Sequence, residues 1–492
     1  MASVSEAKQD ILLRQLMASP GSPARNPTPS KWQDPPCREL LNIRSSELPL
    51  QRDIVIIGSG VTGCSAAWCL LKDGQERLTV SVLEAREICS GATGRNGGRV
   101  HCTAVQDYDT YSKLFGEEAA KDIVRFELAH LPEYQALAKE AGPDATKLSE
   151  LREVTAVLGV FEEAALEDLR RMLRNFNQAF PDLQGLYEVI GSAELRQKYG
   201  PSQAIGGLVY KVGAVWPYRL FTTVYQTLLA RHGARFNLEA NTPIEAVRRS
   251  KSGHGYCVTT PRGCIFAKHV LYCTEAHTAH LLPKTRGLLI PRRGQMTVQK
   301  LENSSAFAGG DVCWSFLLNG VFDYATQNRR TGEIWIGGGD LRAIETADDY
   351  IGVASDAQDS VVARAHLGGV LQAVFDVDKL GTGVSQVNAA WSGIMCFSLD
   401  HAPLVGSLPA NSLAGRRPGD ASSNEWIAAG YGGYGMVNAY LCGKALAQMV
   451  LGSQPPSWLP KQYLLTEQRM EKLTQMLQKI QKGGISDIRA LL

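Results

Sequence analysis

Residues 53–71 read DIVIIGSGVTGCSAAWCLL, and they open a unit that runs to Glu84. Ile54 to Ile57 is a continuous β-branched run, which predicts a strand buried on both faces of a parallel sheet. A glycine-rich turn follows, and then a helix-forming run from Cys64 to Lys72. A second strand is expected from Leu78 to Leu83. This order of strand, turn, helix and strand predicts an α/β domain with a Rossmann-like core.

The turn carries three glycines in the spacing G-x-G-x-x-G. Gly58 allows the tight turn, Gly60 lets a pyrophosphate approach the backbone, and Gly63 lets the helix pack close to the strand. The unpaired N–H groups at the helix start favour phosphate binding. Glu84 ends the second strand, where a carboxylate accepts hydrogen bonds from ribose hydroxyls. Glycine-rich turns are common, so the dinucleotide prediction depends on this whole context, and it does not distinguish FAD from NAD.

Length and composition narrow the class of protein. A chain of 492 residues is too long for one core, so two domains are expected. The net charge of +2 argues against a nucleic-acid-binding surface as a partner site. No apolar run is long enough to span a bilayer, and the N-terminus lacks the apolar core of a signal peptide. The eleven cysteines have no metal-ligand spacing, so we expect reduced thiols, no metal and a cytoplasmic location.

The first 50 residues read as an arm outside the predicted domains. Residues 1–17 favour a short amphipathic helix, and residues 18–36 are rich in Ser and Pro, which favours an extended segment. Trp32 is the one strong anchor in the arm. Two alternatives are open: the arm docks on the body of the protein through Trp32, or it is loose.

A second glycine-dense segment follows Glu84, from Ser90 to His101. Its glycines would let the backbone pass close to a flat or bulky group. Arg95 and Asn96 supply hydrogen-bond donors for an anion or a polar ring. The alternative is an ordinary surface loop.

The run SGATGRNGG at residues 90–98 resembles the second FAD motif of the D-amino-acid-oxidase-like (DAO) flavoproteins, a superfamily that includes glycine oxidase, sarcosine oxidase and γ-glutamylputrescine oxidase. The arm Pro27 to Trp32 resembles that of the fungal group in particular. The resemblance implies FAD as the cofactor. It also implies a glutathione-reductase-type fold, α/β (α+β overall), in which a second domain on a mixed or antiparallel sheet holds the substrate.

Further segments match the family pattern. Val270 to Thr278 is similar to a strand that passes near the flavin, although Glu275 stands there in place of Asn, and we expect its side chain to turn outward. Trp391 to Gly406 is similar to a segment beside the flavin ring, in which Cys396 is a candidate for covalent attachment or an ordinary buried thiol. The glycine-rich run 430–436 resembles the last FAD motif, with Tyr434 in place of its His.

The resemblance carries the expected cofactor contacts onto this chain: Gly58, Ser59, Gly60, Val61, Thr62, Gly63, Glu84, Ala85, Arg86, Thr93, Gly94, Arg95, Asn96, Gly97, Gly98, Thr274, Trp391, Gly393, Gly430, Gly432, Gly433, Tyr434, Gly435 and Met436. The implied domains are the arm at residues 1–50, a discontinuous FAD-binding domain at 51–107, 205–290 and 385–455, a substrate domain at 108–204 and 291–384, and a C-terminal helix at 456–492.

Three residues are candidates for the reaction itself. His101 follows the second motif and would tune amine protonation, because an unperturbed imidazole titrates near physiological pH. Arg293 lies in a segment similar to the family's Pro-x-Arg-Gly-Gln and suits a substrate carboxylate. Tyr324 lies on a predicted strand of the substrate platform. The plain alternatives are a structural histidine, an arginine paired with a structural acid, and a tyrosine on the opposite strand face.

The resemblance implies an enzyme that oxidises a C–N bond of an amine or amino acid, with hydride transfer to flavin N5 and O₂ as acceptor. The alternatives are an FAD-dependent tailoring enzyme that acts on a non-amine substrate in a biosynthetic pathway, and a monooxygenase fed by NAD(P)H. A second G-x-G-x-x-G unit, which would bind a nicotinamide, is not visible in the sequence, and this counts against a monooxygenase that carries two dinucleotide domains. The expected partners are a small-molecule substrate and O₂, without nucleic acid or membrane. Neither the substrate nor the oligomeric state follows from the sequence.

Overall fold

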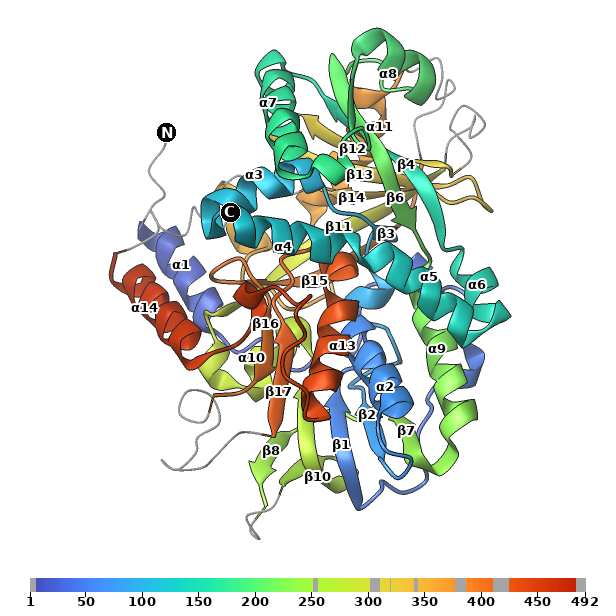
Figure 1. Cartoon of the computed structure of the whole chain (residues 1–492), viewed down its shortest axis with the longest axis vertical. Helices are drawn as coiled ribbons and strands as arrows, with labels where there is room; N and C mark the ends of the chain where they lie inside the picture. The colour runs from blue at the N-terminus through green and yellow to red at the C-terminus, as the bar shows by residue number, and fades with distance from the viewer. Residues whose placement is uncertain are drawn as a thin grey trace.

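Two β-sheets organise the chain, and they lie one above the other in Figure 1. The computed structural model describes residues 6–250, 255–300, 310–318, 320–339, 344–376, 386–409 and 424–483. Both sheets carry helices on their outer sides (Figure 1). The mixed α/β class predicted from the sequence is confirmed.

The first sheet is built on the predicted strand–helix–strand unit. Its central strands run in the order β17-β10-β1-β2-β7 and are parallel, and β16 joins antiparallel at the edge. The β-branched run of β1 is buried on both faces, as a central parallel strand requires. The strands of this sheet are β1 (Gln51–Ile57), β2 (Val80–Leu83), β7 (Phe236–Glu239), β8 (Ala246–Arg249), β9 (Tyr256–Thr260), β10 (Gly263–Tyr272), β16 (Leu404–Ser407) and β17 (Glu425–Ala429).

Three helices cover this sheet: α2 (Val61–Asp73), α9 (Pro217–His232) and α13 (Ala439–Val450). Helices α2 and α13 come from opposite ends of the chain and pack side by side (Figure 1). Their close approach depends on Gly443, because a Cβ there would lie 2.5 Å from the carbonyl oxygen of Thr62. The last glycine-rich segment is thereby held beside the first.

The second sheet forms the upper layer of Figure 1, with the strand order β15-β11-β14-β13-β12-β4-β6-β3 and with β5 beside β6. Three of its strands, β3, β6 and β15, lie in segments that we predicted within the FAD-binding domain. β3 pairs with β6, β6 pairs with β4, and β15 pairs with β11 along twelve residues, so hydrogen bonding places all three in the second sheet. The strands are β3 (Arg99–Val100), β4 (Arg152–Val160), β5 (Glu188–Gly191), β6 (Gly206–Ala214), β11 (Leu289–Lys300), β12 (Val312–Leu318), β13 (Val321–Gln327), β14 (Ile334–Gly338) and β15 (Gln386–Ser398).

The leucine- and alanine-rich region after Tyr108 is helical, as its periodicity predicts. The amphipathic helix α7 buries Leu166, Leu169 and Phe176 and exposes its charged face. The helices around the second sheet are α3 (Ala104–Phe115), α4 (Glu117–Leu128), α5 (His130–Ala141), α6 (Pro143–Ser149), α7 (Glu163–Ala179), α8 (Ser192–Tyr199) and α11 (Val361–Val374).

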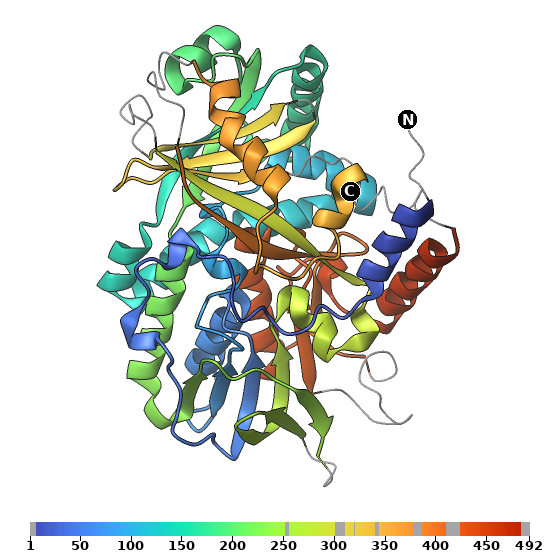
Figure 2. The ribbon, with the colours of Figure 1, turned by 180° about the vertical axis from the view of Figure 1, so that it is seen from behind.

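The N-terminal arm docks on the body of the protein. Helix α1 (Glu6–Met17) lies beside α14 (Glu467–Gly483), and the chain then crosses the molecule in an extended path (Figure 2). Trp32 is buried against Trp216 and Trp335, with ring centroids 5.6 and 4.0 Å away. In the described part of the chain the arm is therefore docked through Trp32 and not loose.

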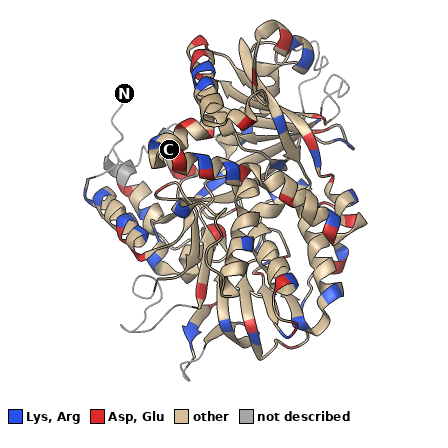
Figure 3. Ribbon diagram, viewed as in Figure 1, with Lys and Arg blue, Asp and Glu red and all other residues tan. Residues whose placement is uncertain are grey.

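Charged residues of both signs alternate along the outer helices, without a face of one sign in the view of Figure 3. This distribution agrees with the balanced composition. No described helix is long and apolar enough to cross a membrane.

Candidate active site

A cavity of about 790 Å³ opens where the carboxyl ends of β1, β2 and β10 meet the second sheet. Ligands of open parallel sheets bind at this edge of the strands. Its walls bring together most of the residues that the sequence singled out: Gly58, Ser59, Gly60, Val61, Thr62, Glu84, Ala85, Arg86, Thr93, Arg95, Asn96, Gly97, His101, Thr274, Arg293, Tyr324, Gly393, Gly432, Gly433, Tyr434, Gly435 and Met436.

Five predicted cofactor contacts lie behind the wall: Gly63, Gly94, Gly98, Trp391 and Gly430. Their place is explained by packing. A Cβ at Gly63 would overlap the carbonyl of Gly58, so this glycine allows the helix to approach the strand. Gly98 has a positive φ of 66°, and a side chain there would overlap the ring of Trp32.

The first motif presents bare backbone to the cavity. Gly58 has a φ of 101°, and a Cβ there would overlap the carbonyl of Cys273. Gly60 caps α2, and a Cβ there would meet only Thr93 Oγ1, at 3.0 Å. The first N–H groups of α2 have no partner within the helix. This cradle fits a pyrophosphate, because the backbone dipoles attract negative charge and no side chain blocks them.

Glu84 stands at the end of β2, where the sequence predicts a ribose contact. Its carboxylate accepts hydrogen bonds from the backbone N and the Oγ of Ser59, at 3.0 and 2.7 Å, and from the backbone N of Arg86, at 3.1 Å. These contacts orient the carboxylate across the strand–helix turn. The position suits the predicted ribose contact, which stays a prediction.

The polar side chains of the second motif form hydrogen bonds within the protein. Arg95 Nε donates to the carbonyl of Ser392 at 2.6 Å, and its Nη2 donates to Thr28 of the arm. Asn96 Nδ2 donates to two carbonyls within its own turn. Both side chains therefore brace the loop, and their role as donors for an anion or a polar ring stays a prediction. The backbone of this segment still lines the cavity.

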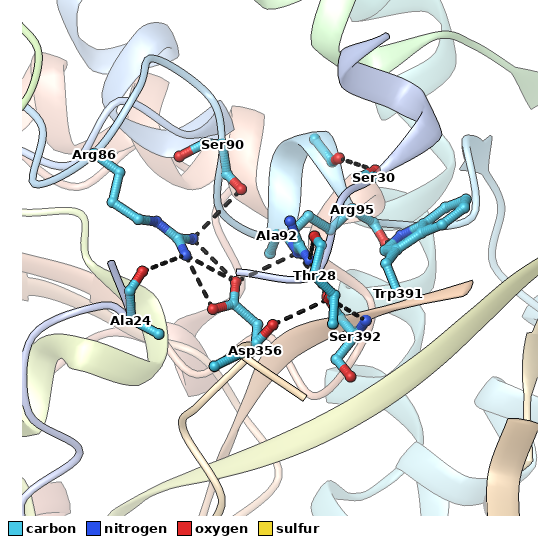
Figure 4. Close-up of polar contacts among 12 residues, drawn as sticks. Ala24, Thr28, Ser30, Arg86, Ser90, Ala92, Arg95, Asp356, Trp391 and Ser392 are labelled. Atoms are coloured by element: carbon cyan, nitrogen blue, oxygen red, sulfur yellow. Dashed lines mark hydrogen bonds and ion pairs between the residues drawn. The ribbon is translucent and has the colours of Figure 1, made fainter. Parts of the chain in front are cut away.

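A buried cluster around Asp356 joins three parts of the chain (Figure 4). Arg86 donates to both carboxylate oxygens of Asp356, at 3.0 and 3.1 Å, and to the carbonyl of Ala24 in the arm. Arg95 Nε lies 3.4 Å from the same carboxylate. Burial lowers the pKa of Arg95 to about 10, and the charge of Asp356 opposes that shift. This cluster clamps the arm across the cavity wall.

The other end of the cavity faces the second sheet. Tyr324 on β13 points into it beside Met296, whose sulfur is 3.3 Å from the Tyr324 hydroxyl. Arg99 lies over the Tyr324 ring at 5.6 Å, and Ser315 Oγ accepts from its two terminal nitrogens at 3.1 Å. Burial raises the pKa of Tyr324 to about 12, so its hydroxyl stays a hydrogen-bond donor.

The surroundings of His101 favour the alternative of a structural histidine over the role in amine protonation, which stays a prediction. Its Nε2 is 2.6 Å from the hydroxyl of Tyr210. Burial, and then the nearby charge of Arg99, lower the pKa of His101 well below its usual value. The imidazole is therefore neutral and acts in hydrogen bonding.

Arg293 pairs with an acidic residue, which is the alternative that we gave to a role in binding the substrate. Its Nη2 contacts the carboxylate of Asp349 and donates to the backbone carbonyl of the same residue at 2.7 Å. Arg293 lies on the cavity wall, but the contacts with Asp349 occupy its Nη2 atom. A role in binding a substrate carboxylate stays a prediction.

Glu275 turns inward, so the expectation of an outward side chain is wrong. Its backbone has a φ of 46°, which is uncommon for a residue with a side chain. The carboxyl oxygens accept hydrogen bonds from the backbone N of Gly430, at 2.9 Å, and of Tyr431, at 3.2 Å. Burial raises the pKa of Glu275 to about 8, against the effect of these donors. The side chain thus fastens β10 to the last glycine-rich segment.

Cys396 is a buried thiol of the core. Its neighbours in β15, Met395 and Phe397, line the cavity, whereas Cys396 is 0% exposed and packs in the core cluster. Successive side chains of a strand point to opposite faces, which explains the difference. Burial raises the pKa of Cys396 well above its usual value, so the thiol stays protonated and unreactive. This placement favours the ordinary buried thiol over covalent attachment.

Several residues at this site were not anticipated. Arg99 carried a signal in the sequence, because a cation followed the second glycine motif two residues before His101. Asp107 lines the cavity and lies next to Glu127, and neither carried such a signal. Asp356 lies 270 residues after its partner Arg86, so only the tertiary fold reveals that pair.

Comparison with known proteins identifies the family. The model of the DAO family, described as FAD dependent oxidoreductase, matches residues 53–449. The chain belongs to this family. FAD is therefore its cofactor, as predicted.

Curated relatives and solved structures agree with this assignment. The chain is 24% identical to the probable oxidoreductase OrdL of Rhizobium meliloti (strain 1021), over 83% of this chain and 85% of the relative. It is 22% identical to the γ-glutamylputrescine oxidoreductase of Escherichia coli (strain K12), over 81% and 84%. The glycine oxidase structure from Geobacillus kaustophilus has a TM-score of 0.65 at 19% identity, covering 85% of this chain and 99% of that one. That likeness confirms the predicted fold.

Proposed function

We propose that this DAO-family enzyme oxidises a C–N bond of an amine or amino acid and passes the electrons to O₂. The observation that carries the proposal is the continuous cavity, which joins the glycine cradle at the strand ends to a chamber under the second sheet, where Arg99, His101 and Tyr324 lie. Support comes from the names of relatives, which include a γ-glutamylputrescine oxidoreductase, a glycine oxidase and an iminodiacetate oxidase.

The residues of the cradle would hold the cofactor. The start of α2 would hold the pyrophosphate, Glu84 would hold the ribose, and the last glycine-rich segment would lie at the flavin end. The chemistry that FAD supplies when bound is the acceptance of a hydride. The chain itself must place a C–H bond and keep the amine unprotonated.

The chamber supplies the groups for that placement. Arg99 lines the cavity and is held by Ser315, so its positive charge would attract a carboxylate of the substrate. The Tyr324 hydroxyl and the neutral His101 offer further hydrogen bonds. Side chains of this kind orient a small polar substrate and exclude water from it.

Oxygen consumption tests the proposal. The purified yellow enzyme would be supplied with amino acids, N-methyl amino acids and polyamines, and O₂ uptake, peroxide and carbonyl product would be measured together. We expect one class to give equal amounts of all three. Reduction of the flavin by NADPH, without oxidation of any amine, would contradict the proposal.

Three finer expectations accompany the proposal. The likeness to the fungal group, the cytoplasmic location and the use of O₂ stay predictions. The relatives described above are bacterial, so they do not test the first of these.

A further inference from the structure

Two carboxyl groups meet beside the cavity, where the proposed reaction has not used them. Asp107 on α3 lines the cavity, and Glu127 on α4 lies behind it. Asp107 is 7% exposed and Glu127 is 1% exposed. Oxygens of both carboxyls and the sulfur of Cys102 lie within 4.8 Å of one another.

Each carboxyl keeps one buried oxygen without a described hydrogen-bond partner. These atoms are Asp107 Oδ2 and Glu127 Oε2. The other oxygens accept hydrogen bonds: Asp107 Oδ1 from the Tyr434 hydroxyl at 3.3 Å, and Glu127 Oε1 from the Tyr111 hydroxyl at 3.0 Å. Among the described residues, neither carboxyl forms an ion pair with a lysine or arginine.

Two uncompensated carboxylates this close cannot both ionise in a buried site. Burial raises the pKa of Asp107, and burial together with the charge of Asp107 raises the pKa of Glu127. Burial and proximity therefore favour the state in which one of the two carboxyls is protonated. The titratable side chains that face the pair are Cys102, Tyr111, Tyr187, Tyr434 and Tyr463.

The pair is connected to the cavity and to the interior. Tyr434 belongs to the last glycine-rich segment and lines the cavity together with Asp107. Behind the pair, Asn438 donates to Glu127 Oε1 at 3.4 Å, and the Tyr463 hydroxyl donates to Asn438 Oδ1 at 2.8 Å. Asp107 thus faces the cavity, and the hydrogen-bonded network of Glu127 lies behind it.

We propose that Asp107 and Glu127 share one proton and accept the proton that a cationic amine substrate must lose before its C–N bond is oxidised. In this step an N–H bond of the ammonium breaks, its electron pair stays on nitrogen, and an O–H bond forms on Asp107. No group is oxidised or reduced. The inference rests on the proposed function and assigns the step that His101, which stays neutral, does not perform.

The pH profile of flavin reduction tests this step. Holoenzyme would be mixed without oxygen with the amine found active, from about pH 6 to about pH 10, in wild type, Asp107→Asn, Glu127→Gln and the control Asp109→Asn. Asp109 lies on the same helix, but it pairs with Lys113 and Arg171. We expect Asp107→Asn to lose about 10²-fold in rate near neutral pH and to recover at high pH, where the free amine is already neutral.

A second measurement does not depend on turnover. Near neutral pH the infrared spectrum of wild type should contain a C=O band of a protonated carboxyl that is lost in Glu127→Gln but kept in Glu275→Gln, because Glu275 is also protonated there. An amine that reduces wild type and Asp107→Asn with the same pH profile would overturn the inference but leave the proposed function standing. The inference would also be overturned if wild type bound one metal ion per chain and the Asp107→Asn variant bound none. Failure of every amine to reduce wild type would overturn both proposals.

Discussion

The substitution Asp356→Asn tests the clamp that fastens the arm to the cavity wall. Asp356 is 3% exposed and faces Arg86 and Arg95, which are also buried. The amide cannot compensate two guanidinium groups, and breaking a buried pair costs about 3–5 kcal/mol. The backbone N of Thr28 donates to the carbonyl of Asp356 at 2.8 Å, so the arm should open with it.

Hydrogen exchange gives the magnitude directly. At about 1.4 kcal/mol for each factor of ten, the amides of residues 19–33 should exchange about 10²–10³-fold faster in Asp356→Asn. The matched control is Asp359→Asn, which breaks the pair with Arg364, whose side chain is 47% exposed. A pair of that kind contributes about 1 kcal/mol or less. Equal protection of the arm in both variants would refute the clamp.

Three other changes test the site. Gly60→Val should give a folded, colourless protein, because the Cβ of the valine would face only Thr93 but would enter the pyrophosphate cradle. Visible absorbance measures the bound flavin, and circular dichroism measures the fold. Gly63→Val should instead destabilise the fold, because its Cβ would overlap the carbonyl of Gly58. Glu275→Gln should gain thermal stability relative to wild type as pH rises from about 5 to about 9. The pKa of Glu275 is about 8 in the folded protein and 4.5 ordinarily, so wild type loses the stability of the protonated carboxyl between these pH values, by at most about 5 kcal/mol. The Glu275→Gln variant does not titrate at this position. A stability difference that does not change with pH would contradict the buried carboxyl. Cys396→Ser should leave the flavin content unchanged. Denaturation of wild type should release the flavin, and flavin that stays on the unfolded chain would instead show covalent attachment.

The parts of the fold that depend on local rules could be predicted from the sequence. The β-branched run at Ile54, the glycine spacing after it and the carboxylate at Glu84 each act within one strand–helix–strand unit. Helix α2 belongs to the same unit: a helix-forming run was expected from Cys64 to Lys72, and the helix runs from Val61 to Asp73.

The features that the sequence did not reveal depend on long-range pairing. β15 reads as part of the FAD-binding domain, and only its pairing with β11 places it in the second sheet. The direction of the Glu275 side chain depends on amide donors that lie 155 residues later in the chain. The pairing of Asp107 with Glu127 depends on how α3 packs against α4, which no local pattern reveals.

The colour of the flavin under anaerobic conditions tests the central claim most directly. The oxidised enzyme would be mixed without oxygen with amino acids, N-methyl amino acids and polyamines, and its visible absorbance followed in time. We expect one of these classes to bleach the flavin in a single turnover, with one equivalent of carbonyl product after quenching. A flavin that none of them bleaches, but that NADPH or a non-amine substrate does, would contradict amine oxidation by this DAO-family enzyme.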